Sequence, residues 1–189
     1  MEPESKPITF RSILREIVIF ILVAVGIVLP FRLYVAEPYV VSGASMDPTF
    51  ATGDYLIVNK LSYELGNKPE RNTVIIFRYP NDPSKDFIKR IIGLPGETVI
   101  QKDNTVTIKN SENSNGFQID QSYVVHQFPG NFQKTLGADE YFVMGDNRAE
   151  SFDSRSWGIL PRKNIIGRPI LRLLPISQIG ILPGADRKD

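Results

Sequence analysis

Hydrophobic positions divide the chain into one long apolar segment near its N-terminus and a series of short apolar runs after it. The long segment covers residues 13–31, and its centre, residues 17–29, contains no polar side chain. Arg15 and Arg32 can snorkel at its two ends, so that roughly 20 residues cross a hydrocarbon core of about 30 Å. This pattern predicts a transmembrane anchor and its exit over residues 13–36.

Basic residues before the apolar centre predict the orientation of this anchor. Lys6, Arg11 and Arg15 all precede it, and the basic flank of such a segment stays in the cytoplasm. Residues 1–12 are therefore expected to form a cytoplasmic tail. Residues 37–189 are then expected on the outer, periplasmic or lumenal side of the membrane.

A removed signal peptide is the main alternative interpretation of the same segment. If Ala36 were the last residue removed, Tyr34 would stand two positions before it, where a small side chain is required. A buried helix of a soluble domain is disfavoured as well, because no polar face interrupts the apolar centre. The pattern therefore favours an anchor that is not cleaved.

Beyond the anchor, the hydrophobic runs become short and rich in β-branched and aromatic residues. Gly, Pro, Asn and Asp bound them, which is typical of strands. Side chains for the two strand faces alternate in residues 97–109 on both sides of Asp103-Asn104, which predicts a hairpin. Pro169 marks a bulge or an edge in the last run. The predicted strands are residues 54–61, 72–80, 86–94, 140–146 and 165–174.

Residues 110–138 interrupt this pattern. They are polar and rich in turn-forming residues, which predicts an insertion or cap of irregular structure. The chain is therefore expected to consist of a tail, one anchor and a mainly β domain over residues 37–189.

Composition excludes several kinds of site. The 22 basic and 21 acidic side chains nearly balance, so no electrostatic argument favours a nucleic-acid partner. The absence of cysteine excludes disulfides, thiolate catalysis and cysteine-based metal sites, and a single histidine excludes a multi-histidine metal site. We therefore expect neither a metal nor a cofactor.

The stretch SGASMDPTF, residues 42–50, contains a candidate nucleophile, Ser45. It does not form a G-x-S-x-G elbow, and no serine in the chain is followed three residues later by lysine. His126 lies in the polar segment YVVHQF, where a lone histidine is more often a surface or packing residue than a base. A base for Ser45 must therefore be sought among the lysines.

Lys89 is the lysine with the most unusual surroundings. It stands in DFIKRIIGLPGE, residues 86–97, and on a strand it would share a face with Phe87 and Ile91. Burial disfavours the ammonium form and lowers the lysine pKa, so that the amine can accept a serine proton. The pattern alone is equally compatible with a lysine whose head reaches water.

Three segments together resemble the signature boxes of the type I signal peptidase family, in the family's order. They are residues 42–50, residues 86–97 and GDNRAESFDSRSWGILP, residues 145–161. TGDYLIVNKL, residues 52–61, also resembles the family pattern. With the anchor, the resemblance covers most of residues 15–170, and the chain is similar to bacterial and cyanobacterial or thylakoid members.

The resemblance implies a signal-peptidase-type β-sheet fold and a Ser-Lys dyad. Ser45 matches the nucleophile, whose backbone N–H would also stabilise the oxyanion, and Lys89 matches the general base. Ser151 matches the serine whose hydroxyl orients the lysine amine. Gly43 stands where some members carry a second oxyanion donor, and the neighbouring Ser42 is only a weak substitute.

The implied activity is removal of signal peptides after a small-x-small motif, such as Ala-x-Ala. An extended substrate would add as a strand to edges near residues 41–45 and 86–89. The expected partners are precursor proteins and membrane lipid, but no nucleic acid, and the protein is expected to be a monomer in a plasma or thylakoid membrane. The substrate pockets are nominated as Val41, Met46, Phe50, Phe87 and Ile88.

Charged residues of the same boxes are expected to support the site. Arg90, on the strand face opposite Lys89, is expected to pair with one of the nearby carboxylates, and the cluster to hold the base in place. The supporting residues are Arg90, Asp146, Arg148, Asp153 and Arg155.

Two other interpretations remain. A self-cleaving repressor shares the Ser-Lys dyad, but it would carry a DNA-binding helix-turn-helix in place of an apolar span. A tethered β-rich binding module, in which Ser45 is structural, or a degenerate, inactive peptidase is the alternative outside the enzymes, although the presence of both Ser45 and Lys89 argues against degeneracy. Covalent labelling of Ser45 that depends on Lys89 would separate an enzyme from such a module.

Overall fold

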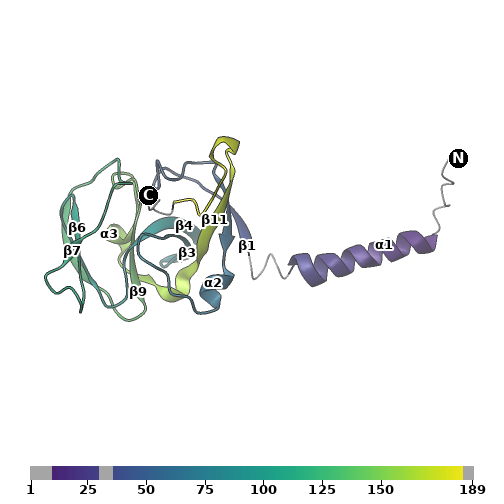
Figure 1. Cartoon of the computed structure of the whole chain (residues 1–189), viewed down its shortest axis with the longest axis horizontal. Coiled ribbons are helices and arrows are strands. Elements are labelled where there is room, and N and C mark those ends of the chain that lie inside the picture. The colour runs from purple at the N-terminus through teal and green to yellow at the C-terminus, as the bar shows by residue number, and fades with distance from the viewer. Residues whose placement is uncertain (1–9, 30–35, 185–189) are drawn as a thin grey trace.

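The computed structural model describes residues 10–29 and 36–184 of the chain, as a helical segment followed by a mainly β domain (Figure 1). The helical elements are α1 (Phe10–Val23), η1 (Ala24–Val28), α2 (Leu61–Glu64), α3 (Ser154–Trp157), η3 (Arg162–Asn164) and η4 (Ile176–Gln178). The strands are β1 (Ala36–Val40), β2 (Tyr55–Asn59), β3 (Val74–Tyr79), β4 (Asp82–Gly93), β5 (Thr98–Asp103), β6 (Thr105–Lys109), β7 (Phe117–Gln118), β8 (Gly130–Thr135), β9 (Glu140–Met144), β10 (Leu160–Pro161), β11 (Ile165–Leu174) and β12 (Gly180–Ile181).

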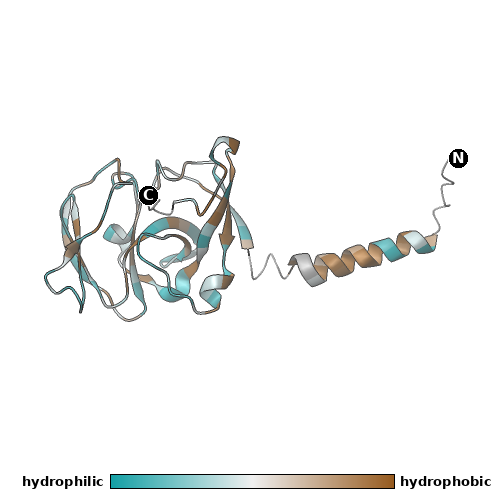
Figure 2. Ribbon diagram, viewed as in Figure 1, coloured by the Kyte–Doolittle hydropathy of each residue, from teal (hydrophilic) through white to brown (hydrophobic). Residues whose placement is uncertain are grey.

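The N-terminal segment is helical where the sequence predicted an anchor. Helix α1 continues into the π-helical turn η1, and none of the side chains of α1 is buried. Figure 2 shows hydrophobic residues along most of α1. Among the residues described, no helix combines the length and the apolar character needed to cross a membrane. The predicted exit at residues 30–35 lies outside the described residues.

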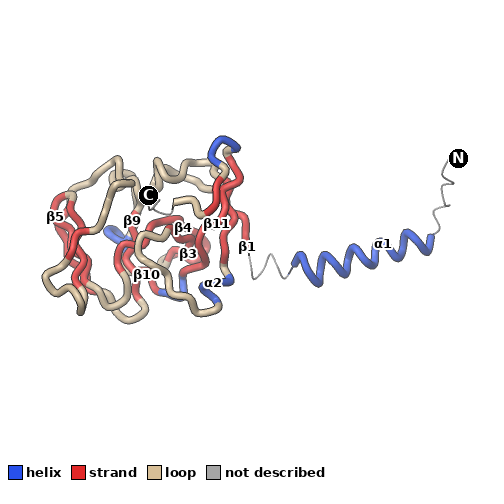
Figure 3. Tube along the Cα trace, in the orientation of Figure 1, coloured by secondary structure: helices blue, strands red, loops and turns tan. Residues whose placement is uncertain are grey.

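The larger sheet holds the predicted strands of the domain. Its order is β1-β2-β11-β3-β4-β9-β10, with β12 added to β11, and the neighbouring strands are antiparallel. β11 covers residues 165–174 as predicted, and its register to β2 shifts between Pro169 and Leu171, which confirms the predicted bulge. Figure 3 shows β3 and β4 near the middle of the domain and β1 at the side that faces α1.

The smaller sheet, in the order β7-β6-β5-β8, is built around the predicted hairpin. Lys102 pairs with Thr105 across the turn, and Asp103 takes the left-handed conformation that such a tight turn requires. The segment 110–138 is more regular than predicted, because β7 and β8 pair with the hairpin's two outer edges. Most side chains of β8 are exposed. The strand is therefore formed by backbone pairing, and its sequence lacks the alternation of hydrophobic and polar residues by which a strand is predicted.

Strand alternation gives β4 two different sets of neighbours. Phe87 and Ile91 contact one core cluster, with Ile75, Phe77 and Trp157. Ile88 points to the other face and contacts a second cluster of Val41, Met46, Phe50, Leu56 and Val74. β4 therefore separates two cores along the segment that carries Lys89.

Candidate active site

The turn after β1 positions Ser45 above the second core. Met46 and Phe50 are almost fully buried beneath it, and the Phe50 N–H donates to the Met46 carbonyl at 2.9 Å. The Asn147 N–H donates to the Ser45 carbonyl at 3.1 Å. The position of Ser45 is thus fixed by the apolar packing of Met46 and Phe50 and by the hydrogen bond from Asn147, in the loop after β9.

Lys89 reaches Ser45 from β4. Its Nζ lies 2.7 Å from Ser45 Oγ and 2.9 Å from the Ile88 carbonyl oxygen, and the residue is only 4% exposed. Burial lowers the Lys89 pKa from 10.5 to about 8, although Asp153 and Asp146 act in the opposite direction. The lysine head therefore lies inside the protein, and a large share of it is neutral near pH 8.

This pair can carry a proton transfer. A neutral amine at this distance can accept the Ser45 hydroxyl proton. Among the described residues the Ser45 N–H has no acceptor, which leaves it available to a developing oxyanion. The Gly43 N–H, in contrast, donates to Thr52 Oγ1 at 3.0 Å, so Gly43 offers no second donor in this arrangement.

Ser151 lies beside the pair without a hydrogen bond to it. Its Oγ is buried and has no hydrogen-bond partner among the described residues. A Cβ added to Gly145 would lie 2.3 Å from Ser151 Oγ and 2.3 Å from the Ser45 carbonyl oxygen. Ser151 and Ser45 therefore approach each other across a position where only glycine fits.

Gly145→Ala is expected to lower kcat/KM about 100-fold or more, because the new methyl group must displace the Ser45 backbone or Ser151. Steady-state cleavage assays on the purified variant would measure this. Gly180→Ala is the matched control, since its added Cβ would approach no atom closer than 3.8 Å. Near-normal kcat/KM in Gly145→Ala would show that the close approach is not required.

A buried ion pair lies on the other face of β4, as predicted for Arg90. Arg90 donates through Nε to Asp146 Oδ1 at 2.9 Å and through a terminal nitrogen to Asp146 Oδ2 at 2.7 Å. Both side chains are at most 1% exposed. Thr49, in the turn that carries Ser45, donates to Asp146 Oδ2 at 2.6 Å. This pair ties β4 to the Ser45 turn.

Asp153, Arg155 and Arg148 organise the loop that carries Ser151. Asp153 caps α3 and accepts bonds from the Gly145 N–H at 3.0 Å and from Arg155 at 2.7 and 2.8 Å. Arg148 donates to the Gly145 carbonyl at 3.1 Å and to Gln121, and burial lowers its pKa. All five predicted supporting residues therefore converge on the loop around Gly145 or on the ion pair beneath it.

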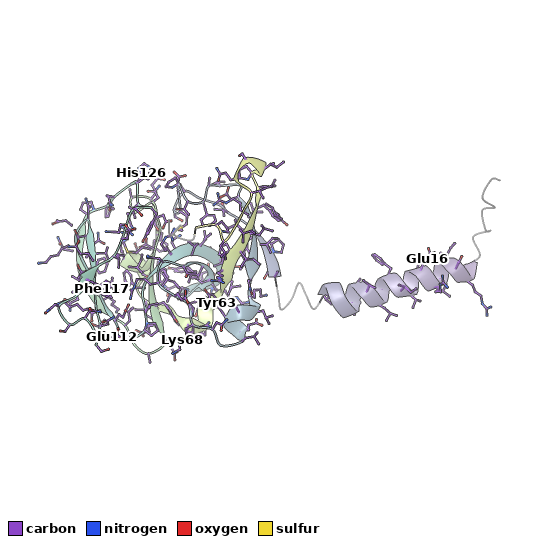
Figure 4. The ribbon with its side chains drawn as sticks, in the orientation of Figure 1. Glu16, Tyr63, Lys68, Glu112, Phe117 and His126 are labelled. Atoms are coloured by element: carbon purple, nitrogen blue, oxygen red, sulfur yellow. The ribbon has the colours of Figure 1, made fainter. Side chains whose placement is uncertain are left out.

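His126 takes no part in this arrangement. It is exposed on the loop between β7 and β8, at the upper edge of the domain in Figure 4. Within residues 10–29 and 36–184, no group of three or more His, Asp or Glu side chains is placed to hold a metal ion.

A cleft of about 280 Å³ opens beside Ser45 and Lys89. Of the predicted pocket residues, Val41, Phe87 and Ile88 line it, whereas Met46 and Phe50 are not among its lining residues and belong to the core beneath. The reason is that their side chains turn inward in the bend after Ser45. The cleft also has lining residues that sequence reasoning missed, namely Tyr39, Ile76, Asp86 and Phe152.

Two of these missed residues carried a signal in the sequence. Tyr39 lies two positions before the predicted pocket residue Val41, so strand alternation could have placed it on the same face. Phe152 lies within the third resembling box, directly after Ser151. Ile76 carried no such signal, because only the pairing of β3 with β4 brings it to the cleft.

Comparison with known proteins decides the family. The family model described as signal peptidase, peptidase S26, matches residues 14–174. This chain belongs to the signal peptidase family, peptidase S26. A signal peptidase I of Leptolyngbya laminosa is 39% identical over 170 residues, which cover 84% of this chain and 79% of that protein. A probable signal peptidase I-2 of Synechocystis is 35% identical over 181 residues, covering 92% and 78%.

A solved signal peptidase I structure, from Enterococcus faecalis, aligns with a TM-score of 0.47 and 31% identity over 54% of this chain and 97% of that chain. The family match and the sequence relatives confirm the resemblance of the three boxes to type I signal peptidases. The family match and these relatives identify the chain as a serine hydrolase that acts in signal peptide processing.

Proposed function

We propose that the chain is a membrane-anchored serine endopeptidase that removes N-terminal signal peptides after a small-x-small motif, with Ser45 as nucleophile and Lys89 as general base. The observation that carries this proposal is the 2.7 Å contact between Ser45 Oγ and the Nζ of a buried lysine. A lysine with a pKa of about 8 is suited to accept a serine proton near neutral pH.

The reaction follows from this pair. Lys89 takes the Ser45 proton as Ser45 Oγ attacks the carbonyl carbon, and the Ser45 N–H donates to the oxyanion that forms. The protonated Lys89 then gives its proton to the leaving amine, which is the N-terminus of the mature protein. Lys89 next takes a proton from a water molecule as its oxygen attacks the acyl carbon, and it returns this proton to Ser45 Oγ as the ester bond breaks and the signal peptide leaves with a free carboxylate.

The residues around the pair hold Lys89 in place in this proposal. Ser151 is a positioning residue, because its unpartnered buried hydroxyl lies in the same loop as the ion-paired Asp153. Asp146 and Asp153 also counteract the loss of the lysine's charge. Arg90, Arg148 and Arg155 complete this support through the contacts described above.

Sheet topology supports binding of the substrate as an added strand. Among the described strands, β1 is an edge strand that pairs with β2 alone, and β4 pairs with β9 only from Arg90 onward. The edges at residues 39–44 and 86–88 are therefore open on the two sides of the cleft. A cleft of about 280 Å³ suits small side chains at alternate substrate positions.

The exposed apolar surface of α1 supports anchoring to the membrane. Its large hydrophobic side chains are between 44% and 80% exposed, which water penalises and lipid does not. Lys6, Arg11 and Arg15 support a cytoplasmic N-terminus. The catalytic domain would then meet precursors on the outer or lumenal side, where their apolar segments leave the bilayer.

The rate should rise with pH below the Lys89 pKa. Only the neutral amine can accept the Ser45 proton, so kcat/KM is expected to increase about tenfold per pH unit below pH 8 and to level off above it. A kcat/KM profile of the wild-type enzyme from pH 5.5 to 10 would check this. A profile that falls as the pH rises through 8 would contradict Lys89 as the base.

The proposal is tested by locating the cleavage site. Purified full-length protein in detergent is incubated with a precursor whose signal peptide ends in Ala-x-Ala, and the products are identified by mass spectrometry. Wild type is expected to cut after the second alanine, and Ser45→Ala to leave the precursor intact. Inert wild-type protein would favour the tethered binding module, and an active Ser45→Ala variant would contradict Ser45 as the nucleophile.

A further inference from the structure

Phe152 is an aromatic side chain on the wall of the cleft that packing alone does not explain. It is 53% exposed, although it directly follows Ser151, whose hydroxyl oxygen is buried. Its ring contacts Tyr79 edge-on at 5.8 Å and Phe87 at 6.5 Å between centroids. Leaving half of such a ring in water is unfavourable, which raises the question of what covers it when the cleft is occupied.

The two faces of β4 present different surfaces to the cleft. Ile76 and Ile88 are direct partners across β3 and β4, so they lie on one face of the sheet. Phe77 and Phe87 are the next pair and lie on the opposite face. Phe152 packs against Phe87. One side of the β4 edge therefore presents the aliphatic pair Ile76 and Ile88, with Asp86 further along the same face, and the other side is aromatic.

A strand added to this edge must direct alternate side chains to these two faces. The proposed function requires small side chains at alternate substrate positions, and the aliphatic side near Ile76 and Ile88 would hold both of them. The residue between them then points to the opposite face of the sheet. That face carries Phe87 and Phe152, and both line the cleft.

We propose that Phe152, together with Phe87, selects the middle residue of the small-x-small motif and favours a large apolar or aromatic side chain there. This inference rests on the proposed function and adds a substrate preference to it. An aromatic middle residue would cover the exposed ring of Phe152 and gain edge or offset contact with it. An acidic residue would be disfavoured, because it would lose hydration without gaining a partner on the two rings.

The test uses three precursors that differ only in the middle residue, Ala-Ala-Ala, Ala-Phe-Ala and Ala-Asp-Ala. Wild type is expected to cleave the phenylalanine precursor with a kcat/KM roughly tenfold above that of the alanine precursor, mainly through KM. Phe152→Ala should reduce this ratio to about 1 while still cleaving the alanine precursor, and Phe152→Tyr should retain the preference.

Leu65→Ala is the matched control, because Leu65 is 74% exposed at the end of α2 and does not line the cleft. It should leave the ratio between precursors unchanged. Because the ratio is measured within one variant, partial unfolding cannot mimic the result. Equal cleavage of all three precursors by wild type, or an unchanged ratio in Phe152→Ala, would overturn this inference but not the proposed function. No cleavage of any precursor would overturn both.

Discussion

Lys89→Met is expected to lower kcat by about 10⁴-fold or more, because removal of the base leaves Ser45 without a proton acceptor. Among the described residues, no other lysine and no histidine hydrogen-bonds to Ser45 Oγ. Methionine matches the lysine side chain as far as Cε but carries no titratable group, so the cleft should keep its shape. Single-turnover assays at pH 8 with an Ala-x-Ala precursor would measure the loss.

The same substitution is expected to stabilise the fold. The Lys89 pKa is lowered to about 8 in the folded protein, against 10.5 when exposed, so below pH 8 the protein binds a proton at a buried site that disfavours it. Relief of this penalty corresponds to about 3 kcal/mol in the free energy of unfolding. The gain should be complete below pH 8 and should shrink as the pH rises towards 10.5, where the lysine is neutral in both states.

Lys85→Met is the matched control, since Lys85 lies on the same strand with its side chain 64% exposed. It should change neither kcat nor the unfolding free energy appreciably. Denaturant unfolding of the three proteins at pH 6 and pH 10 separates the two effects. An active Lys89→Met variant would contradict Lys89 as the base. A variant less stable than wild type at pH 6 would contradict a stability cost from burial of the Lys89 charge.

Asp146→Ala is expected to destabilise the domain by about 3–5 kcal/mol, because it leaves the Arg90 guanidinium buried without its carboxylate. Arg90 keeps bonds to the Asn72 and Gly184 carbonyls at 2.7 Å, but these neutral acceptors do not replace the charge. The Ser45 turn also loses its bond from Thr49. Activity should therefore fall together with stability, as measured by denaturant unfolding and cleavage assays.

Asp82→Ala provides the comparison, because Asp82 forms an exposed pair with Lys85 at 2.9 Å. Such a pair is expected to contribute little, so this variant should unfold near the wild-type midpoint. The double variant Asp146→Leu with Arg90→Met should recover much of the stability lost in Asp146→Ala. If Asp146→Ala unfolds like Asp82→Ala, the buried pair does not carry the stability assigned to it.

Strand positions were largely predictable because they depend on local side-chain chemistry. β11 coincides with the predicted residues 165–174, and the hairpin turns at Asp103 as its sequence indicates. β8 was missed because its pairing with β5 uses backbone groups that every residue carries. Met46 and Phe50 were assigned to the pocket because sequence position alone does not tell which way a bend directs its side chains.

Residue types and their order along the chain were enough to predict the family, the mainly β character of the domain and the candidate pair, because these depend on local chemistry and not on contacts between distant segments. The folded arrangement was needed to show that Lys89 is buried against Ser45, that the Ser151 hydroxyl has no hydrogen-bond partner among the described residues, and that Phe152 forms a wall of the cleft. The physical reason is that burial and distance arise where segments far apart in the chain meet. Ser45, Lys89 and Gly145 belong to three such segments.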